Sequence, residues 1–375
     1  MMRGMINQAL REAGRPSASA SARPAAEVPG STTYIRNQWQ ARINQALAPK
    51  PSARAQVAVP EAQAVAQPAA GPAVTLAAPA QIDGDRVLKQ VYGYLGYMAI
   101  WPSQWAQVTA ALYAAHAHAR GEDGLPVWQY EPRLFFTSRQ GGSGKSWLAR
   151  QVASLCPDGK GLVEMTKASL IDLIAQHATV TIGEMDVLVG SGKRTQWLTG
   201  IANAGYEPDR MTSRKVNGKV KEIPLFAPMI LDGLDSVIHQ TGEDLKTLMS
   251  RCIIVHVEKA PEGYRPPRFD REKRAIAAAL NGRLARWMAQ EVEDGIGDHI
   301  PELPEGVGNR PAALWEPLLA VADAAGGVWP ALARGALERI ESATGLPGED
   351  EAAEARIDSA LDSWGAQEPS WPDGG

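Results

Sequence analysis

The stretch FFTSRQGGSGKSWLARQV, at residues 135–152, constrains the fold of this chain more than any other. The residues around it predict a short apolar strand at 133–138 and a helix from Lys145 to Leu155. Glycines let a strand turn sharply into a helix, so that backbone N–H groups and the positive end of the helix dipole face one point. The stretch therefore predicts a phosphate-binding loop. The alternative is a glycine-rich surface loop whose lysine is incidental.

The residues of this loop have expected roles. Lys145 is expected to neutralise the β- and γ-phosphates, and Ser146 to offer a hydroxyl to Mg²⁺. Arg139 stands where such loops usually begin with glycine, five positions before Gly144, so the next two glycines must provide the tight turn. With ATP and Mg²⁺ as the expected ligands, the predicted binding residues are Gly141, Gly142, Ser143, Gly144, Lys145 and Ser146.

Beyond the loop, apolar strands alternate with helices. Strands are expected at 161–166, 180–186, 225–233 and 252–258, helices at 169–177 and 195–205, and a hairpin turn at Asn217-Gly218. Strands that are apolar throughout and alternate with helices indicate a mainly parallel sheet covered on both faces, hence an α/β fold.

Acidic residues suited to hydrolysis follow the third of these strands. Glu184 is expected to activate the attacking water, and Asp186 to serve as a metal-shell ligand, because alternate residues of an extended strand share a face. Gly183 stands where an aspartate would be expected. Two solvated side chains at a strand end are the alternative.

Two further candidates lie near later strands. Asp232 closes the strand at 225–233, where a polar group would contact the γ-phosphate or the water. Arg251 precedes the last strand and could stabilise a nucleotide bound by the next subunit, although a salt bridge at the strand start accounts for it equally well. The predicted catalytic residues are therefore Lys145, Glu184, Asp232 and Arg251, and the predicted metal ligands Ser146 and Asp186.

These stretches resemble a family of P-loop proteins of uncharacterised domain type, the helicase-like part of primase–helicases in phages and plasmids. The resemblance runs from about residue 88 to about 340, and its most particular part is NRPAALWEPLLAVADAAGGVWPALARGAL at 309–337. It rests also on FFTSRQGGSGKS, TVTIGEMD, LTGIANAGYEPDRMTSRKV, PLFAPMILDG and LMSRCIIVHV.

The resemblance implies a RecA- or AAA+-like P-loop ATPase that works on DNA in mobile-element replication. It carries phosphate binding over to Gly144, Lys145 and Ser146, acid chemistry to Glu184 and Asp186, and a finger-type role to Arg251. Gly183 departs from the acidic pair usual in the family. The expected organisation is a disordered basic tail at 1–80, helical portions at 84–125 and 266–343 around a P-loop core at 126–265, and a disordered acidic tail at 344–375.

The segment at 309–337 also has a physical interpretation of its own. Its apolar residues mark a helical hairpin in which Trp315 is expected to be a core residue rather than a base-stacking platform. Because a proline inside a helix costs about 3 kcal/mol, Pro317 predicts that the first helix begins near Glu316.

The tails differ in charge and in pattern. Residues 1–80 carry eight Lys or Arg against three Glu, and residues 341–375 nine acidic side chains against one Arg, so the net charge of −4 says little about partners. INQAL occurs at 6–10 and again at 43–47. It indicates either chance similarity in a biased composition or a pair of short helices that dock a replication or phage protein, or nucleic-acid phosphates.

Other features restrict the setting. Cys156 and Cys252 have no metal or redox spacing, which favours a reduced, cytoplasmic environment. The most apolar stretch, 91–101, is too short to span a membrane, and no membrane association is expected. His116 and His118 lie two apart on a predicted helix and cannot share a metal, so they are expected to be surface or packing residues.

Two functions fit these observations. The first is an ATP-driven motor or loader acting on single- or double-stranded DNA, which could assemble as a homo-oligomeric ring. The second is a nucleotide-dependent regulatory or adaptor protein that hydrolyses ATP slowly or not at all and binds partners through its tails. Gly183 and the repeated INQAL favour the second, whereas Arg251 and the basic tail favour the first.

Overall fold

A computed structural model describes residues 81–161, 165–190, 196–216, 218–239 and 242–343. Both predicted tails, the two copies of INQAL, residues 162–164 of a predicted strand and Asn217 lie outside the described residues.

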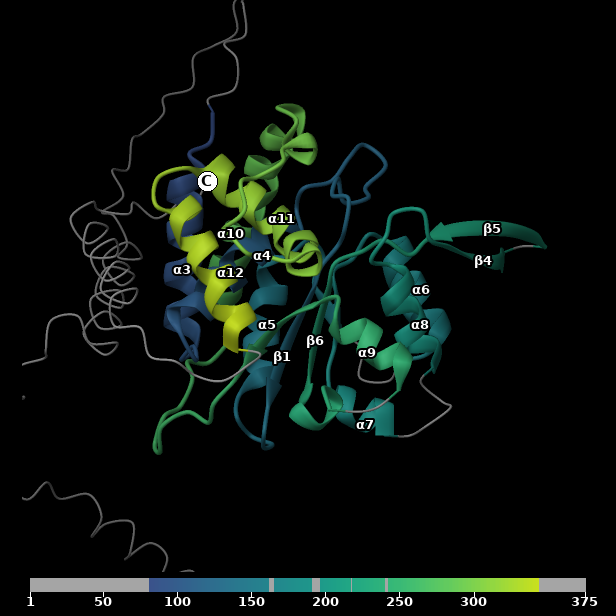
Figure 1. Cartoon of the computed structure of the whole chain (residues 1–375), viewed down its shortest axis with the longest axis horizontal. Coiled ribbons are helices and arrows are strands. Elements are labelled where there is room, and N and C mark those ends of the chain that lie inside the picture. Colours follow the sequence, from purple (N-terminus) through teal and green to yellow (C-terminus); the bar gives the residue numbers. More distant parts are fainter. Residues whose placement is uncertain (1–80, 162–164, 191–195, 217, 240–241, 344–375) are drawn as a thin grey trace, which may run out of the picture. The chain divides into compact units, whose positions relative to one another are not determined.

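The centre of the described part is a five-stranded sheet in the order β2-β3-β6-β1-β7, with every neighbouring pair parallel (Figure 1). The strands are β1 (Arg133–Ser138), β2 (Lys160–Gly161), β3 (Val180–Ile182), β6 (Met229–Leu234) and β7 (Cys252–His256). The predicted α/β class with a parallel sheet is confirmed.

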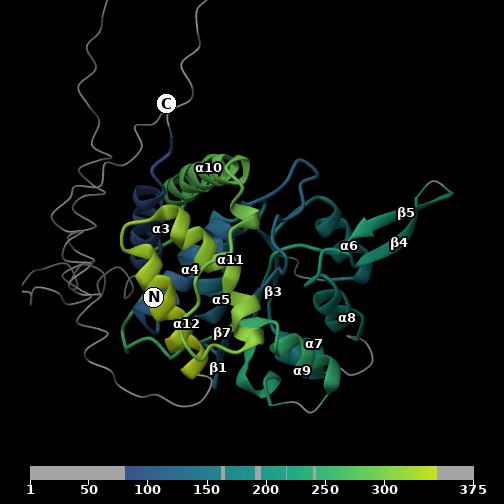
Figure 2. The same ribbon diagram turned by 45° about the horizontal axis from the view of Figure 1, so that its top comes forward.

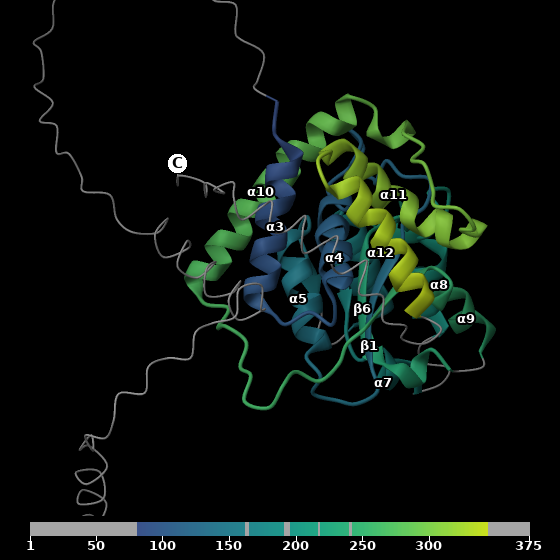
Figure 3. The ribbon, with the colours of Figure 1, turned by 60° about the vertical axis from the view of Figure 1, so that its left-hand side comes forward.

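Both faces of the sheet are covered by helices, as predicted. Successive residues of β1 point to opposite faces, so Leu134 and Phe136 pack into one hydrophobic cluster and Phe135 into the other. Figure 1 shows the two helical layers on either side of β1 and β6, and Figure 3 shows α3, α4 and α5 beside these strands. The first layer holds α3 (Gly84–Met98), α4 (Gln104–His116), α5 (Lys145–Leu155), α10 (Arg271–Glu293), α11 (Asn309–Ala325) and α12 (Trp329–Ala343), and the second α6 (Lys167–Ala175), α8 (Gln196–Ala204) and α9 (Glu243–Met249).

The third strand is shorter than predicted. β3 ends at Ile182, Glu184 takes a left-handed backbone conformation with φ 55°, and α7 (Met185–Gly190) begins at the next residue. The extended backbone on which Glu184 and Asp186 were expected to share a face is therefore absent, and that part of the prediction is wrong. A residue with a left-handed backbone interrupts a strand, and the periodicity of the sequence does not reveal this conformation.

The predicted hairpin is formed by β4 (Met211–Val216) and β5 (Lys219–Pro224), which pair antiparallel with Val216 opposite Lys219. Gly218 has φ 81°, the conformation that a two-residue hairpin connection requires and that glycine adopts without strain. Figures 1 and 2 show the hairpin extending away from α6 and α8, beside which it begins.

The helix that contains Pro317 begins earlier than predicted. α11 starts at Asn309, and Pro317 lies inside it, so the expected start near Glu316 is wrong. The first two turns bury Leu314 and Trp315, and these apolar contacts offset the hydrogen bond that proline cannot donate. Trp315 is 0% exposed, which confirms it as a core residue.

Trp315→Ala is expected to lower the free energy of unfolding by about 3–5 kcal/mol, because it leaves a large cavity in the helical layer. It also removes the indole N–H that donates to Oε1 of Glu341 at 2.9 Å. Chemical denaturation followed by far-UV circular dichroism measures the change. Ile300→Ala, at a side chain that is 83% exposed, should change the free energy by less than about 0.5 kcal/mol, and equal effects would contradict the packing.

The two histidines of the α4 region are packing residues. Nε2 of His116 lies 2.8 Å from Oε1 of Glu131, and Nε2 of His118 lies 2.7 Å from the carbonyl oxygen of Leu155. Burial lowers the pKa of His118 to about 4. They face different groups, as their spacing predicts. Across the described residues, no helix combines the length and the apolar character needed to cross a membrane.

Candidate nucleotide-binding site

The glycine-rich loop lies at the carboxyl end of β1, where the order of the sheet reverses. The chain leaves β1 for β2 and β3 on one side, and only later fills the places on both sides of β1 with β6 and β7. In open α/β sheets, ligands bind outside the carboxyl ends of the strands at such a point. The topology therefore places the loop where a ligand is expected.

The glycines give the loop its shape. Gly142 and Gly144 have φ 75° and 96°, which side chains other than glycine rarely adopt. A Cβ atom added to Gly141, Gly142 or Gly144 would meet nothing within 4 Å, so the space beside the loop is open. Ser143 is buried, and its hydroxyl donates to Oγ of Ser138 at 2.9 Å, which anchors the loop to the end of β1.

The helix after the loop begins without a side-chain cap. Gly144 is the N-cap residue of the eleven-residue α5 and offers no side-chain hydrogen bond to the first turn. The amides of Lys145 and Ser146 therefore lie at an open, electropositive helix end. With glycines on the approach and a lysine as its first residue, this end suits a phosphate group.

Ser146 meets an acid from another strand. Its hydroxyl donates to Oδ1 of Asp232 at 2.8 Å, and Asp232 is 2% exposed near the end of β6. Burial raises the pKa of Asp232, whereas the Ser146 hydroxyl, the backbone N–H of Glu184 and the positive charge of Lys145 act against this increase. Three other predicted site residues, Lys145, Ser146 and Glu184, thus gather around the buried carboxylate of Asp232.

Gly183 makes room for this carboxylate. A Cβ atom on Gly183 would lie 3.1 Å from Oδ2 of Asp232, closer than a carbon usually approaches an oxygen. Gly183, the residue directly after β3 at which an aspartate was expected, has no side chain, and Asp232 of the neighbouring strand borders the space that such a side chain would enter. The arrangement replaces an acid on β3 by an acid on β6.

Glu184 directly precedes α7 and has a strained backbone conformation. Its φ of 55° is uncommon for a residue other than glycine, and its carbonyl accepts hydrogen bonds from the N–H groups of Val187 and Leu188. The side chain is exposed beside the carboxylate of Asp232, whose pKa its charge raises. Strain of this kind is concentrated at functional sites.

Asp186 takes a structural position rather than one beside Ser146. Its Oδ1 accepts a hydrogen bond from the N–H of Leu234 at 2.9 Å and so ties α7 to the end of β6. Ser146 and Asp186 were expected to be ligands of the same metal ion. The structure instead brings Asp232 to the hydroxyl of Ser146.

Arg251 lies at the opposite edge of the sheet. Its carbonyl accepts from the N–H of Arg133, the first residue of β1, and the six residues of β1 rise about 3.3 Å each before the glycine loop begins. Its guanidinium donates to the carbonyl of Asn203 at 2.8 Å and stacks 5.0 Å from the ring centre of Tyr206. Arg251 cannot reach the loop of its own chain, so a finger role requires a second copy.

Sequence reasoning missed three polar residues at the carboxyl edge. The hydroxyl of Thr137 donates to Oδ1 of Asp235 at 2.7 Å, and Nδ1 of His256 lies 3.7 Å from the same oxygen. Thr137 is the second-last residue of β1, His256 is the last residue of the neighbouring β7, and Asp235 directly follows β6. Their positions at predicted strand ends were the signal that could have identified them.

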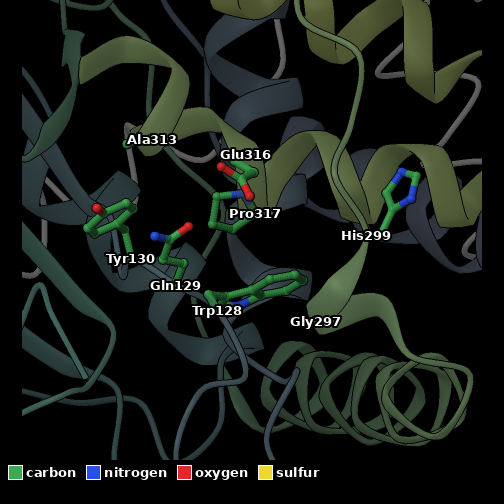
Figure 4. Close-up of a pocket in the computed structure, with 8 residues that line it drawn as sticks. All are labelled: Trp128, Gln129, Tyr130, Gly297, His299, Ala313, Glu316 and Pro317. Atoms are coloured by element: carbon green, nitrogen blue, oxygen red, sulfur yellow. The ribbon is translucent and has the colours of Figure 1, made fainter. Parts of the chain in front are cut away.

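A small pocket elsewhere is separate from this site. Figure 4 shows it between the segment 128–130, Gly297, His299 and α11, with Trp128, Gln129 and Tyr130 facing Glu316 and Pro317. None of its lining residues is a predicted site residue.

The donor set beside the glycine loop fits Mg²⁺ together with a phosphate. Among the described residues, no group of three or more His, Cys, Asp or Glu could hold a metal by itself. Mg²⁺ is usually held by one or two carboxylates, water and the oxygens of a bound phosphate, so a dedicated cage is not needed. Ser146 and Asp232 together provide a hydroxyl and a carboxylate of this kind.

The family match covers the helical end of the chain. Residues 258–359 match a family described as a protein of unknown function (DUF3631), and this range includes α10, α11 and α12 but not the glycine loop. The chain is 40% identical over 78 residues to "Uncharacterized 28.9 kDa protein in xis 5'region" of Saccharopolyspora erythraea. The match covers 21% of this chain and 28% of that relative.

Proposed function

We propose that this protein binds ATP with Mg²⁺ at the glycine loop and hydrolyses it, as a RecA- or AAA+-like P-loop ATPase. The observation that carries the proposal is the 2.8 Å hydrogen bond from Ser146 to Asp232, formed beside the open, uncapped end of α5. A glycine-rich surface loop with an incidental lysine does not account for a buried acid from another strand at that position.

Each residue of the site has a role in this proposal. The backbone N–H groups near Ser143 and the ammonium of Lys145 hold the phosphates. Mg²⁺ would be held by the hydroxyl of Ser146 and, directly or through water, by the carboxylate of Asp232, and when bound it neutralises charge on the phosphate oxygens. Glu184, exposed beside them, accepts the proton of the attacking water.

Action on DNA in mobile-element replication belongs to the same proposal. Its support is the resemblance to the helicase-like part of primase–helicases, together with the two matches, which fit an association with mobile elements. A ring would bring Arg251 of one copy towards the loop of the next, where it could stabilise charge on the phosphates.

A slow or non-hydrolysing nucleotide-dependent adaptor is the second candidate, and Gly183 favours it. ATP turnover by the purified protein, with and without single-stranded DNA, separates the two. Turnover that DNA stimulates supports the motor or loader. Tight ATP binding with negligible turnover, unchanged by DNA, supports the adaptor and excludes the motor.

A further inference from the structure

The hairpin of β4 and β5, which is a separate two-stranded sheet, is rich in positive charge. Between Met211 and Pro224 it has four basic residues and one acidic residue. The basic residues are Arg214, Lys215, Lys219 and Lys221, and the acid is Glu222.

The pairing register places three of these charges on one face. Arg214 lies directly opposite Lys221, and Val216 opposite Lys219. Directly opposed residues of an antiparallel pair share a face, and so do residues two apart on a strand, so Arg214, Lys219 and Lys221 lie together. Like charges directly opposite each other destabilise a hairpin, and the charge of Arg214 is compensated by an ion pair with Asp172 of α6.

The remaining charges are available to a ligand. Lys215, Lys219 and Lys221 are exposed, and none forms an ion pair with another residue in the part of the chain that the structure describes. Figure 2 shows the two strands projecting from the neighbouring helices as a free ribbon. A two-stranded ribbon with a row of cations can lie along a nucleic-acid backbone or enter a groove.

We propose that this hairpin is a DNA-binding element that contacts the phosphate backbone through Lys219 and Lys221, which lie on one face of the ribbon. The inference rests on the proposed function in that it takes DNA as the ligand. The base of the hairpin is closed by the hydrogen bond from the N–H of Leu225 to the carbonyl of Arg210, at 2.9 Å. Leu225 leads directly into the segment that ends at Asp232, so the hairpin is joined to the strand that carries the buried acid of the candidate site.

The test is DNA binding by the full chain, measured by fluorescence anisotropy over a series of salt concentrations. Labelled single-stranded DNA and a duplex of the same sequence form the two arms. The test variant is Lys219→Gln/Lys221→Gln. The control, Lys160→Gln/Lys246→Gln, removes the same charge from two lysines that pair with their own neighbouring acids.

The hairpin variant is expected to bind about tenfold or more weakly at low salt, because two phosphate contacts are lost. The slope of log affinity against log salt should fall by roughly 1.4 for single-stranded DNA or 1.8 for duplex, whichever arm binds. Its melting temperature should be no lower than that of the control, since a like-charge pair is removed.

If both variants bind DNA with the affinity and the salt slope of the unaltered chain, the hairpin assignment is overturned, while DNA binding by the chain stands. Equal losses in both would also overturn it, because the effect would then follow net charge alone. If the unaltered chain binds neither single-stranded DNA nor the duplex, the DNA part of the proposed function fails, and the hairpin inference fails with it.

Discussion

Glu184→Gln is expected to lower ATP turnover by about 10²- to 10⁴-fold while ATP binding is retained. The amide keeps the length and shape of the glutamate but cannot accept the proton of the attacking water. The side chain is exposed, so the substitution should not disturb the core. A coupled phosphate-release assay measures turnover, and calorimetry measures binding by the same preparation.

Glu305→Gln is the matched control, because Glu305 is also an exposed glutamate but lies in the loop before α11. It should leave turnover unchanged. A Glu184→Gln protein that turns over ATP at the unaltered rate would remove Glu184 from the reaction and leave only the binding half of the proposal.

Asp232→Asn is expected to weaken the binding of ATP in the presence of Mg²⁺ by about 10- to 100-fold, because an interaction with a charged group is worth about 1.5–3 kcal/mol. The amide oxygen of asparagine can still accept the hydrogen bond from Ser146, so the loss of ATP affinity measures the effect of the negative charge of Asp232. Mn²⁺ paramagnetic resonance provides a readout of metal binding that is independent of turnover. Unchanged metal and ATP affinity would contradict the role of Asp232.

The same substitution is expected to raise the melting temperature of the ligand-free protein near neutral pH. Burial raises the pKa of Asp232 above 3.8, so ionisation costs the folded state more than the unfolded state. The protonated carboxyl group of Asp232 contributes stability that is fully present below pH 3.8. This contribution is lost as the pH rises through the raised pKa of the folded state. The advantage of the asparagine should therefore disappear on acidification, and thermal melts at several pH values measure it.

The sequence predicted the sheet well because its signals were local. β1, β6 and β7 each contain a run of at least three apolar residues, and each is bounded by a loop or a helix signal, so their places along the chain were clear. The place of the glycine loop between a strand and a helix could also be predicted, since its closely spaced glycines favour a sharp turn there.

The pairing of acids could not be predicted in the same way, because it depends on which strands become neighbours. Asp232 follows Ser146 by 86 positions, and the two meet only because β6 is inserted between β1 and β3. The left-handed backbone of Glu184 likewise leaves no trace in periodicity, and it moved Asp186 from a strand onto a helix.

The arrangement of charge on the hairpin also could not be predicted from the sequence. The turn at Gly218 was predicted, but the basic residues on both strands gain significance only when the register places Arg214 beside Lys221. For Pro317, the free-energy cost of an interior proline could be predicted from the sequence. The burial of α11 that offsets this cost could not, because it depends on the partner helices.

The central claim is that the loop at 139–146 binds the phosphates of ATP. Calorimetric titration of the full chain with ATP in the presence of Mg²⁺, beside Lys145→Ala, tests it most directly. We expect one site per chain, with affinity about 10- to 100-fold weaker in the variant, because one charged contact to phosphate is lost. No binding of ATP by the unaltered protein, or equal affinity in both proteins, would contradict the claim.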